Sequence, residues 1–168
     1  MNESITYRQA TVADVSNICE LAQPLAGIHH RARPDIYTDS TQDFARHEAH
    51  WLPRLQAENR ATFLASQGSV AVGFITVSLT EAASPLLQPM RVCHIWSICV
   101  IEEYRGRGIG TELMKRAKSW AEGHGATDMR LTVWTFNEPA IRLYRELGYE
   151  VRAFEMGMRL GEDGQGRG

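Results

Sequence analysis

The segment "EEYRGRGIGTEL", residues 102–113, places three glycines and two arginines between an apolar run and a stretch with helical spacing. A turn needs one glycine or two, whereas a backbone that lies directly against an anion needs several positions without Cβ atoms. The helix that follows begins with N–H groups that have no intrahelical partner, and its macrodipole adds about half a positive charge there. The segment therefore predicts a phosphate-binding turn between a strand and the N-terminus of a helix.

The overall composition offers no other anion site. The 168 residues fit one domain, and 43% hydrophobic and 23% charged residues are close to the globular average. A net charge of -2 gives no broad basic surface, so neither nucleic acid nor an anionic membrane is an expected partner. Any anion must be bound locally, by the turn itself.

The three cysteines, Cys19, Cys93 and Cys99, have no CxxC spacing and are odd in number. They argue against a disulfide framework and a structural zinc site, and they suit a reducing cytosol. Cys93 and Cys99 lie in an apolar run, where we expect buried, unreactive thiols. The first residues do not resemble a signal peptide, and no window approaches the ~20 apolar residues of a membrane span. The expected location is the cytoplasm.

The order of the expected elements is that of a mixed α/β domain. Strands are predicted by alternating or β-branched runs at residues 5–10, 62–66, 70–79, 91–101, 129–135 and 150–160. Helices are predicted by apolar spacing at residues 12–25, 41–59, 111–125 and 137–149. Pro24 is expected to end or kink the first of them, and Pro53 to break the second. Residues 26–40 read as an irregular polar segment. One domain is expected over residues 1–160, followed by a disordered, glycine-rich tail at 161–168.

Two common nucleotide-binding motifs do not fit the glycine turn. A Walker A loop needs GxxxxGK[ST], and the segment has no lysine followed by Ser or Thr. A Rossmann fingerprint needs GxGxxG near the start of a βαβ unit, whereas the spacing here is GxGxG and the unit comes late in the chain. A different use of the phosphate-binding turn is therefore expected.

The turn resembles the pyrophosphate loop of the GNAT superfamily of N-acetyltransferases, whose pattern [RQ]xxGx[GA] is filled by Arg105, Gly108 and Gly110. A second stretch, "NEPAIRLYRELGY", is similar to the family block N-x-x-A-x-x-x-Y-x-x-x-G-[FY]. That block is filled by Asn137, Ala140, Tyr144, Gly148 and Tyr149. Two motifs in the family's order make the resemblance specific over residues 92–151.

The resemblance implies an α/β (α+β) fold with a single GNAT-like domain. Its mixed central sheet would have about six to seven strands flanked by about four helices, with strands 92–101 and 129–135 parallel and splayed apart. Acetyl-CoA, the co-substrate, would bind between them, with its pantetheine arm paired like a strand. The implied cofactor-binding residues are Ile98, Cys99, Val100, Arg105, Gly106, Arg107, Gly108, Ile109, Gly110, Thr111, Asn137, Ala140 and Tyr144.

The implied reaction is direct transfer of acetyl from the thioester to a neutral amine. Tyr144 takes the position of the family's general acid, with core packing as the alternative. Asn137 either only caps its helix or also bonds the pantetheine. His94 is the candidate general base, because imidazole ordinarily titrates at about 6.5 and because period two puts it on one strand face with Trp96 and Ile98. A histidine without a catalytic role is the alternative.

The resemblance leaves the acceptor open. Family members that acetylate protein N-termini often have a glutamate where this chain has Thr132, so a small-molecule amine is the first expectation and a peptide amine the second. The family commonly builds its acceptor pocket from the segment that here holds His29, His30, Asp35 and Tyr37.

Other residues offer weaker signals. Glu102 and Glu103 read as solvated carboxylates, and His47 and His50 lack the HExxH pattern, so no metal is expected. A homodimer is possible, with residues 150–160 taking part. The alternative to an enzyme is a non-catalytic CoA-binding sensor of the same fold.

Overall fold

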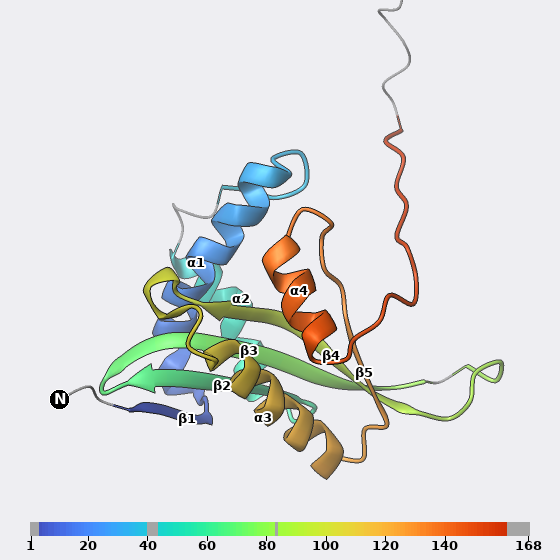
Figure 1. Ribbon diagram of the computed structural model, residues 1–168, viewed down its shortest axis with the longest axis horizontal. Coiled ribbons are helices and arrows are strands. Elements are labelled where there is room, and N and C mark those ends of the chain that lie inside the picture. Colours follow the sequence, from blue (N-terminus) through green and yellow to red (C-terminus); the bar gives the residue numbers. More distant parts are fainter. Residues whose placement is uncertain (1–3, 40–43, 83, 161–168) are drawn as a thin grey trace, which may run out of the picture.

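The computed structural model describes residues 4–39, 44–82 and 84–160. Its described strands form one five-stranded sheet in the order β1-β2-β3-β4-β5 (Figure 1). These strands are β1 Ile5–Gln9, β2 Arg60–Gln67, β3 Val70–Glu81, β4 Arg91–Val100 and β5 Asp128–Leu131. The first four run antiparallel to their neighbours, and β5 is parallel to β4. The mixed sheet confirms the expected α+β class.

Helices cover both faces of the sheet. They are α1 Val15–Ala32, α2 Phe44–Gln56, α3 Ile109–Gly123 and α4 Glu138–Glu146, with single 3-10 turns η1 Val12–Asp14 and η2 Glu102–Tyr104. Side chains alternate along β3, so Phe74 joins the core under α1 and α2 while Ile75 and Val77 join the core under α3 and α4. The sheet therefore separates two apolar cores.

Local signals in the sequence are confirmed in several elements. The strands predicted at residues 62–66 and 70–79 form a hairpin as β2 and β3, and Gly68 in its turn has a φ of 56°. Asn137 caps α4 by accepting a hydrogen bond from the Ala140 N–H at 3.4 Å. The strand, glycine turn and helix that end in α3 follow one another as predicted.

The prediction that Pro53 breaks its helix is wrong, and Pro24 does not end α1. Helix α1 continues through Pro24 and α2 through Pro53, so residues 26–32, expected to be irregular, are helical. A proline inside a helix removes one hydrogen bond to the fourth preceding residue. In α1, the fully buried side chains of Ile18 and Cys19 pack on the sheet, and this burial outweighs that local loss.

The expected sheet of six to seven strands is too large. The described residues form five strands, β5 ends at Leu131 instead of near residue 135, and residues 150–160 are extended without a strand partner (Figure 1). A strand needs a neighbour for its backbone hydrogen bonds, and no described part of this chain covers the segment: Phe154 is 87% and Met156 92% exposed. The tail predicted at 161–168 lies outside the described residues.

A β-bulge in β4 changes which side chains share a face. Thr76 on β3 pairs with Ser97, but the next residue, Val77, pairs with Ile95, so the register skips Trp96. The prediction that His94 and Ile98 share a face is therefore wrong. His94 pairs with Ser78 on the α1/α2 side, whereas Ile98 pairs with Ile75 on the α3/α4 side. Period two fails here because one extra residue shifts the alternation.

Candidate active site between two diverging strands

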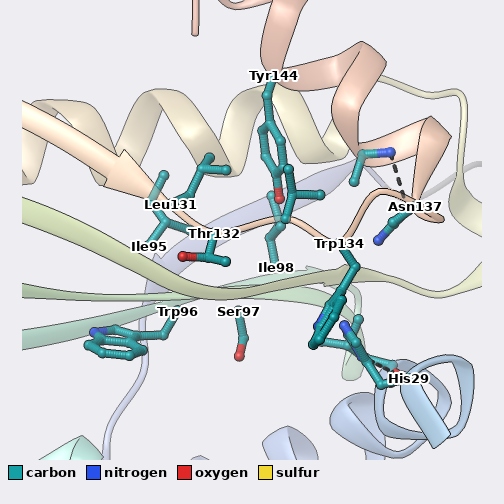
Figure 2. A pocket seen from close by; sticks show the side chains of 13 residues that line it. His29, Ile95, Trp96, Ser97, Ile98, Leu131, Thr132, Trp134, Asn137 and Tyr144 are labelled. Carbon is teal, nitrogen blue, oxygen red and sulfur yellow. Dashed lines mark hydrogen bonds between the residues drawn. The ribbon is translucent and has the colours of Figure 1, made fainter. Parts of the chain in front are cut away.

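The parallel strands β4 and β5 part where the bulge lies. Their last pair is Ile95 with Leu131, and a pocket of about 90 Å³ opens beyond it. The pocket is lined by Leu25, His29, Ile95, Trp96, Ser97, Ile98, Leu131, Thr132, Val133, Trp134, Asn137, Ala140 and Tyr144. Figure 2 shows Tyr144 reaching it from one side of the strands and His29 lying on the other. The opening thus connects the two faces of the sheet, and we refer to it as the sheet opening.

The glycine turn leads from β4 into α3. Gly106 and Gly108 have φ angles of 72° and 77°, which only glycine adopts without strain. Gly108 is the N-cap residue of α3 and supplies no side-chain cap, so the first N–H groups of the helix lack the usual acceptor. A Cβ on Gly108 would meet no atom within 4 Å, so the turn is open on its outer side. This backbone can receive an anion on several N–H groups.

The two arginines of the turn bind the chain's own backbone. Arg105 donates from Nε to the Val100 carbonyl at 3.0 Å, and Arg107 donates to the Glu103 carbonyl at 2.9 Å. The Arg107 guanidinium also lies 4.7 Å from the centre of the Tyr104 ring. Both side chains therefore stabilise the shape of the turn while adding positive charge beside it, a structural role that sequence reasoning missed.

Tyr144 projects from α4 into the sheet opening. The residue is only 8% exposed, and it lines the same pocket as Thr132 and Ile98 (Figure 2). Burial raises the pKa of this phenol to about 12. Tyr144 is therefore a neutral hydrogen-bond donor at physiological pH. Asn137 and Ala140 from the first turn of the same helix line the opening beside it.

The backbone of β4 after the bulge has one paired edge. Ile98, Cys99 and Val100 pair with β3, while β5 has ended on their other side. Of these three residues, only Ile98 lines the opening with its side chain. The side chain of Cys99 is buried in the core under α1 and α2. Burial raises the pKa of the Cys99 thiol, and that of Cys93 to about 11, which confirms the expected buried thiols.

His94, the histidine predicted as a base, lies beside the opening and does not line it. Its ring centre is 5.9 Å from that of Trp96. Burial lowers the pKa of His94, and the positive charge of Arg130 lowers it further against the opposing effect of Asp128. The imidazole is therefore disposed to be neutral.

An aromatic cluster, His29, Tyr37, Trp134 and Phe136, covers the α1 side of the opening. The Trp134 indole N–H donates to the Tyr37 hydroxyl at 2.7 Å, and the rings of Trp134 and Phe136 stack with centres 6.0 Å apart. The Arg33 guanidinium lies 5.1 Å from the centre of the Trp134 ring. Sequence reasoning missed both aromatic residues, because it assigned Trp134 to a strand and gave Phe136 no role. Two aromatic residues shortly after β5 were the available signal.

The other polar residues expected near the acceptor take separate positions. His30 shares a hydrogen bond between Nδ1 and the Tyr37 carbonyl at 2.7 Å and does not line the opening. Asp35 pairs with Arg33 at 2.7 Å and with Arg159 at 2.6 Å. The hydrogen bond from Arg33 is the main reason that the pKa of the Asp35 carboxyl lies far below its usual range.

Two further kinds of site are absent from the part of the chain that the structure describes. Among residues 4–39, 44–82 and 84–160, no group of three or more His, Cys, Asp or Glu side chains is placed to hold a metal ion. Within the same ranges, none of the helices combines the length and apolar character that crossing a membrane requires.

Comparison with known proteins gives consistent matches. The model of the acetyltransferase (GNAT) family matches residues 25–149. An N-alpha-acetyltransferase of Sulfurisphaera tokodaii is 34% identical over 118 residues, which cover 67% of this chain and 71% of that protein. A thialysine N-epsilon-acetyltransferase of Mus musculus is 35% identical over 88 residues, 49% of this chain and 46% of that protein.

A solved structure shares the fold. The aminoglycoside N-acetyltransferase AAC(6')-Iy in complex with CoA superposes with a TM-score of 0.72 at 21% identity, covering 95% of this chain and 96% of that one. At 21% identity this similarity supports a shared fold and nothing more.

Proposed function

Since the chain belongs to the acetyltransferase (GNAT) family, and is thus an acyltransferase with acetyl-CoA as its co-substrate, we propose that it acetylates a primary amine of a small molecule by direct transfer. A peptide amine is the second class of acceptor. Relatives named for N-alpha and for thialysine N-epsilon acetylation support an amine as the acceptor.

The sheet opening is the observation that carries the proposal. Direct transfer needs a passage in which a thioester and an amine meet from different sides, with water largely excluded. The pocket between β4 and β5 draws its walls from both faces of the sheet, and the glycine turn lies on the chain directly after β4. This arrangement favours entry of the donor from the α3/α4 side and of the acceptor from the α1 side.

On the donor side, the diphosphate would bind the N–H groups from Arg105 to Thr111, including those of Gly106, Arg107, Gly108, Ile109 and Gly110. The uncapped start of α3 supports this assignment, because an anion there takes the place of the missing cap. The pantetheine arm would pair with the free edge of β4 at Ile98, Cys99 and Val100. Asn137 and Ala140 would contact the arm from α4.

The chemistry would proceed by attack of a neutral amine on the thioester carbonyl. The C–N bond forms, the C–S bond breaks, and the departing thiolate needs a proton. Tyr144 would donate it, since its buried phenol holds its proton at physiological pH and points into the opening. The phenol would then recover a proton from the new amide nitrogen, directly or through water.

The walls of the opening favour an acceptor with an apolar body. None of its described lining residues is an aspartate or glutamate, so the opening offers no carboxylate to a polycation. Trp134 and Phe136 present stacked rings next to it. Thr132 stands where family members specific for protein N-termini often have glutamate, which supports a small molecule ahead of a peptide.

The cofactor assignment can be tested with two tryptophan substitutions. Gly108→Trp fills the space at the turn and should reduce acetyl-CoA affinity at least tenfold in isothermal titration calorimetry. Gly125→Trp is the matched control, because Gly125 also has a positive φ, 78°, and open space around its Cβ position, at the opposite end of α3. Equal acetyl-CoA affinity in both variants would refute the assignment of the glycine turn as the diphosphate site.

A CoA-binding sensor would bind acetyl-CoA in the same way, so turnover must separate the two functions. A panel of primary amines, with thiol release from acetyl-CoA as the readout, serves this purpose. Release that depends on at least one amine supports the enzyme, and binding without any release supports the sensor.

Self-association through the C-terminal segment, residues 150–160, is also proposed. Phe154, Met156, Met158 and Leu160 alternate along it and are each at least 83% exposed. The outer edge of β5 carries no strand among the described residues, because β5 ends the sheet order. A second copy would provide the unpaired segment with a backbone partner and an apolar surface.

A further inference from the structure

The transfer described above requires a group that removes a proton from the incoming ammonium, and we propose that His29 is this general base. The inference rests on the proposed function. His29 belongs to neither motif of the family resemblance, and its role follows from the position and hydrogen bonding of its imidazole.

His29 lies on the side of the sheet opening from which the acceptor would enter. It is in the last turns of α1 and lines the pocket, while Tyr144 reaches the same pocket from α4 (Figure 2). In the tetrahedral intermediate the attacking nitrogen and the departing sulfur are separate substituents of the carbon, so the base and the acid reach it from different directions. A base on the α1 side and an acid on the α4 side match this requirement.

A backbone carbonyl determines which ring nitrogen of His29 is available. Nδ1 lies 2.8 Å from the Leu25 carbonyl oxygen, one turn earlier in α1. A carbonyl oxygen can only accept, so the proton in this bond belongs to Nδ1. In the neutral ring the lone pair is then on Nε2.

Aromatic contacts hold the orientation of the ring. Tyr37 lies 4.9 Å from it, centre to centre, and Phe136 lies 6.0 Å away with an edge-on geometry. With Nδ1 bound and the ring packed on these neighbours, Nε2 is the nitrogen left for an acceptor amine. The arrangement is that of a positioned proton acceptor, a group that typically contributes about 10²–10⁴-fold to a rate.

Few charged groups surround this imidazole. Arg33, the residue that caps the end of α1, has its guanidinium over Trp134. The hydroxyl of Tyr37 accepts from Trp134, His30 is bonded to the Tyr37 backbone, and Asp35 is paired with two arginines. The segment from β5 to α4 contributes only aromatic rings to the cluster.

His29 and Tyr144 together account for every proton that moves in the reaction. The ammonium of the acceptor gives one proton to His29 Nε2, which later releases it to solvent. The neutral amine attacks, and the second proton lost from nitrogen replaces the one that Tyr144 gives to the sulfur. The net products are an amide, the free CoA thiol and one proton.

The first test examines the ring itself and needs no acceptor. Long-range ¹H–¹⁵N NMR correlations distinguish the two neutral tautomers, and His29→Gln assigns the signal. His29 is expected to be protonated on Nδ1. His124, whose Nδ1 lies 2.7 Å from the Trp120 carbonyl at the end of α3, should show the same pattern far from the opening. A proton on Nε2 of His29 would overturn the proposal.

The second test uses an amine that the panel described above identifies. For His29→Gln we expect a loss of about 10²-fold in kcat, disappearance of the acidic limb in the pH profile of kcat/KM, and unchanged acetyl-CoA affinity. His124→Gln is the matched control and should keep both the wild-type kcat and the acidic limb of the kcat/KM profile. His94→Gln tests the base predicted from the sequence.

The outcomes separate this proposal from the proposed function. If His29→Gln keeps the acidic limb, or if His94→Gln alone removes it, the role of His29 is refuted. The proposed acetyltransferase function is not affected by that result. If the wild-type protein binds acetyl-CoA but acetylates no amine, the transfer itself fails, and the role of His29 fails with it.

Discussion

The indole N–H of Trp134 donates a hydrogen bond to the hydroxyl of Tyr37 at 2.7 Å, joining the segment after β5 to the segment after α1. The two residues are 97 positions apart in the chain. The bond ties together the parts of the aromatic cluster that surround the proposed acceptor entrance.

Removing this bond should weaken acceptor binding more than cofactor binding. A typical hydrogen bond contributes about 1 kcal/mol, so Tyr37→Phe is expected to raise the KM for the amine about fivefold. The acetyl-CoA Kd from calorimetry should not change. Tyr7→Phe, on β1, is the control. A Tyr37→Phe enzyme with an unaltered amine KM would show that the bond does not shape the acceptor side.

Replacing the proposed general acid should affect turnover and leave the cofactor bound. Tyr144→Phe keeps the ring that packs in the core and removes only the hydroxyl. We expect kcat to fall about 10²-fold. Because the pKa of Tyr144 is raised to about 12, the wild-type enzyme should lose no activity through this group between pH 7 and 10. Equal turnover in variant and wild type would remove the tyrosine from the mechanism.

The buried carboxylate of Asp14, in η1, should make stability depend on acidic pH. Arg8 donates to both of its oxygens at 2.8 and 2.6 Å, and these bonds are the main reason that its pKa is lowered to about 2. An unfolded aspartate titrates near ~3.9, so the folded state holds the proton less tightly. The stabilisation is present above about pH 4 and is lost as the pH falls towards 2.

Urea unfolding of Asp14→Asn at several pH values tests this. At pH 7 the substitution should cost about 1–3 kcal/mol, because it leaves hydrogen-bonding groups of Arg8 and Thr11 poorly paired. The difference from wild type should shrink below pH 4. Glu58→Gln, at an exposed position, is the control. A difference that stays constant down to pH 2 would contradict the assignment.

The C-terminal segment should control the oligomeric state. Sedimentation at micromolar concentration is expected to give the mass of a dimer for the wild-type chain and that of a monomer for Met156→Asp. Leu86→Asp is the matched control, because Leu86 and Met156 are both 92% exposed. A wild-type chain that is monomeric at all concentrations would refute the pairing.

Features encoded within a few residues could be predicted from the sequence. The turn between β4 and α3 depends on glycines that adopt positive φ, and the start of α4 depends on Asn137 bonding the N–H of Ala140. Each of these signals lies inside one turn of chain. The order of strand, glycine turn and helix was therefore predicted, and four of the predicted residues, Ile98, Asn137, Ala140 and Tyr144, line the sheet opening.

Features that depend on contacts between distant residues could not be predicted from the sequence. The bulge at Trp96 exists only in relation to β3, and the position of His29 follows from α1 continuing through Pro24 because its apolar side is buried. The aromatic cluster joins residues from two ends of the chain. No local pattern encodes these contacts, and they form the α1 side of the sheet opening.

The sheet opening lies where β4 contains one extra residue, Trp96. Deleting Trp96 would still leave Ile95 opposite Val77 and Ser97 opposite Thr76, so both cores would keep their side chains. The strand would, however, lose the irregularity at which it departs from its parallel neighbour. A single inserted position thus marks the point at which β4 and β5 cease to pair.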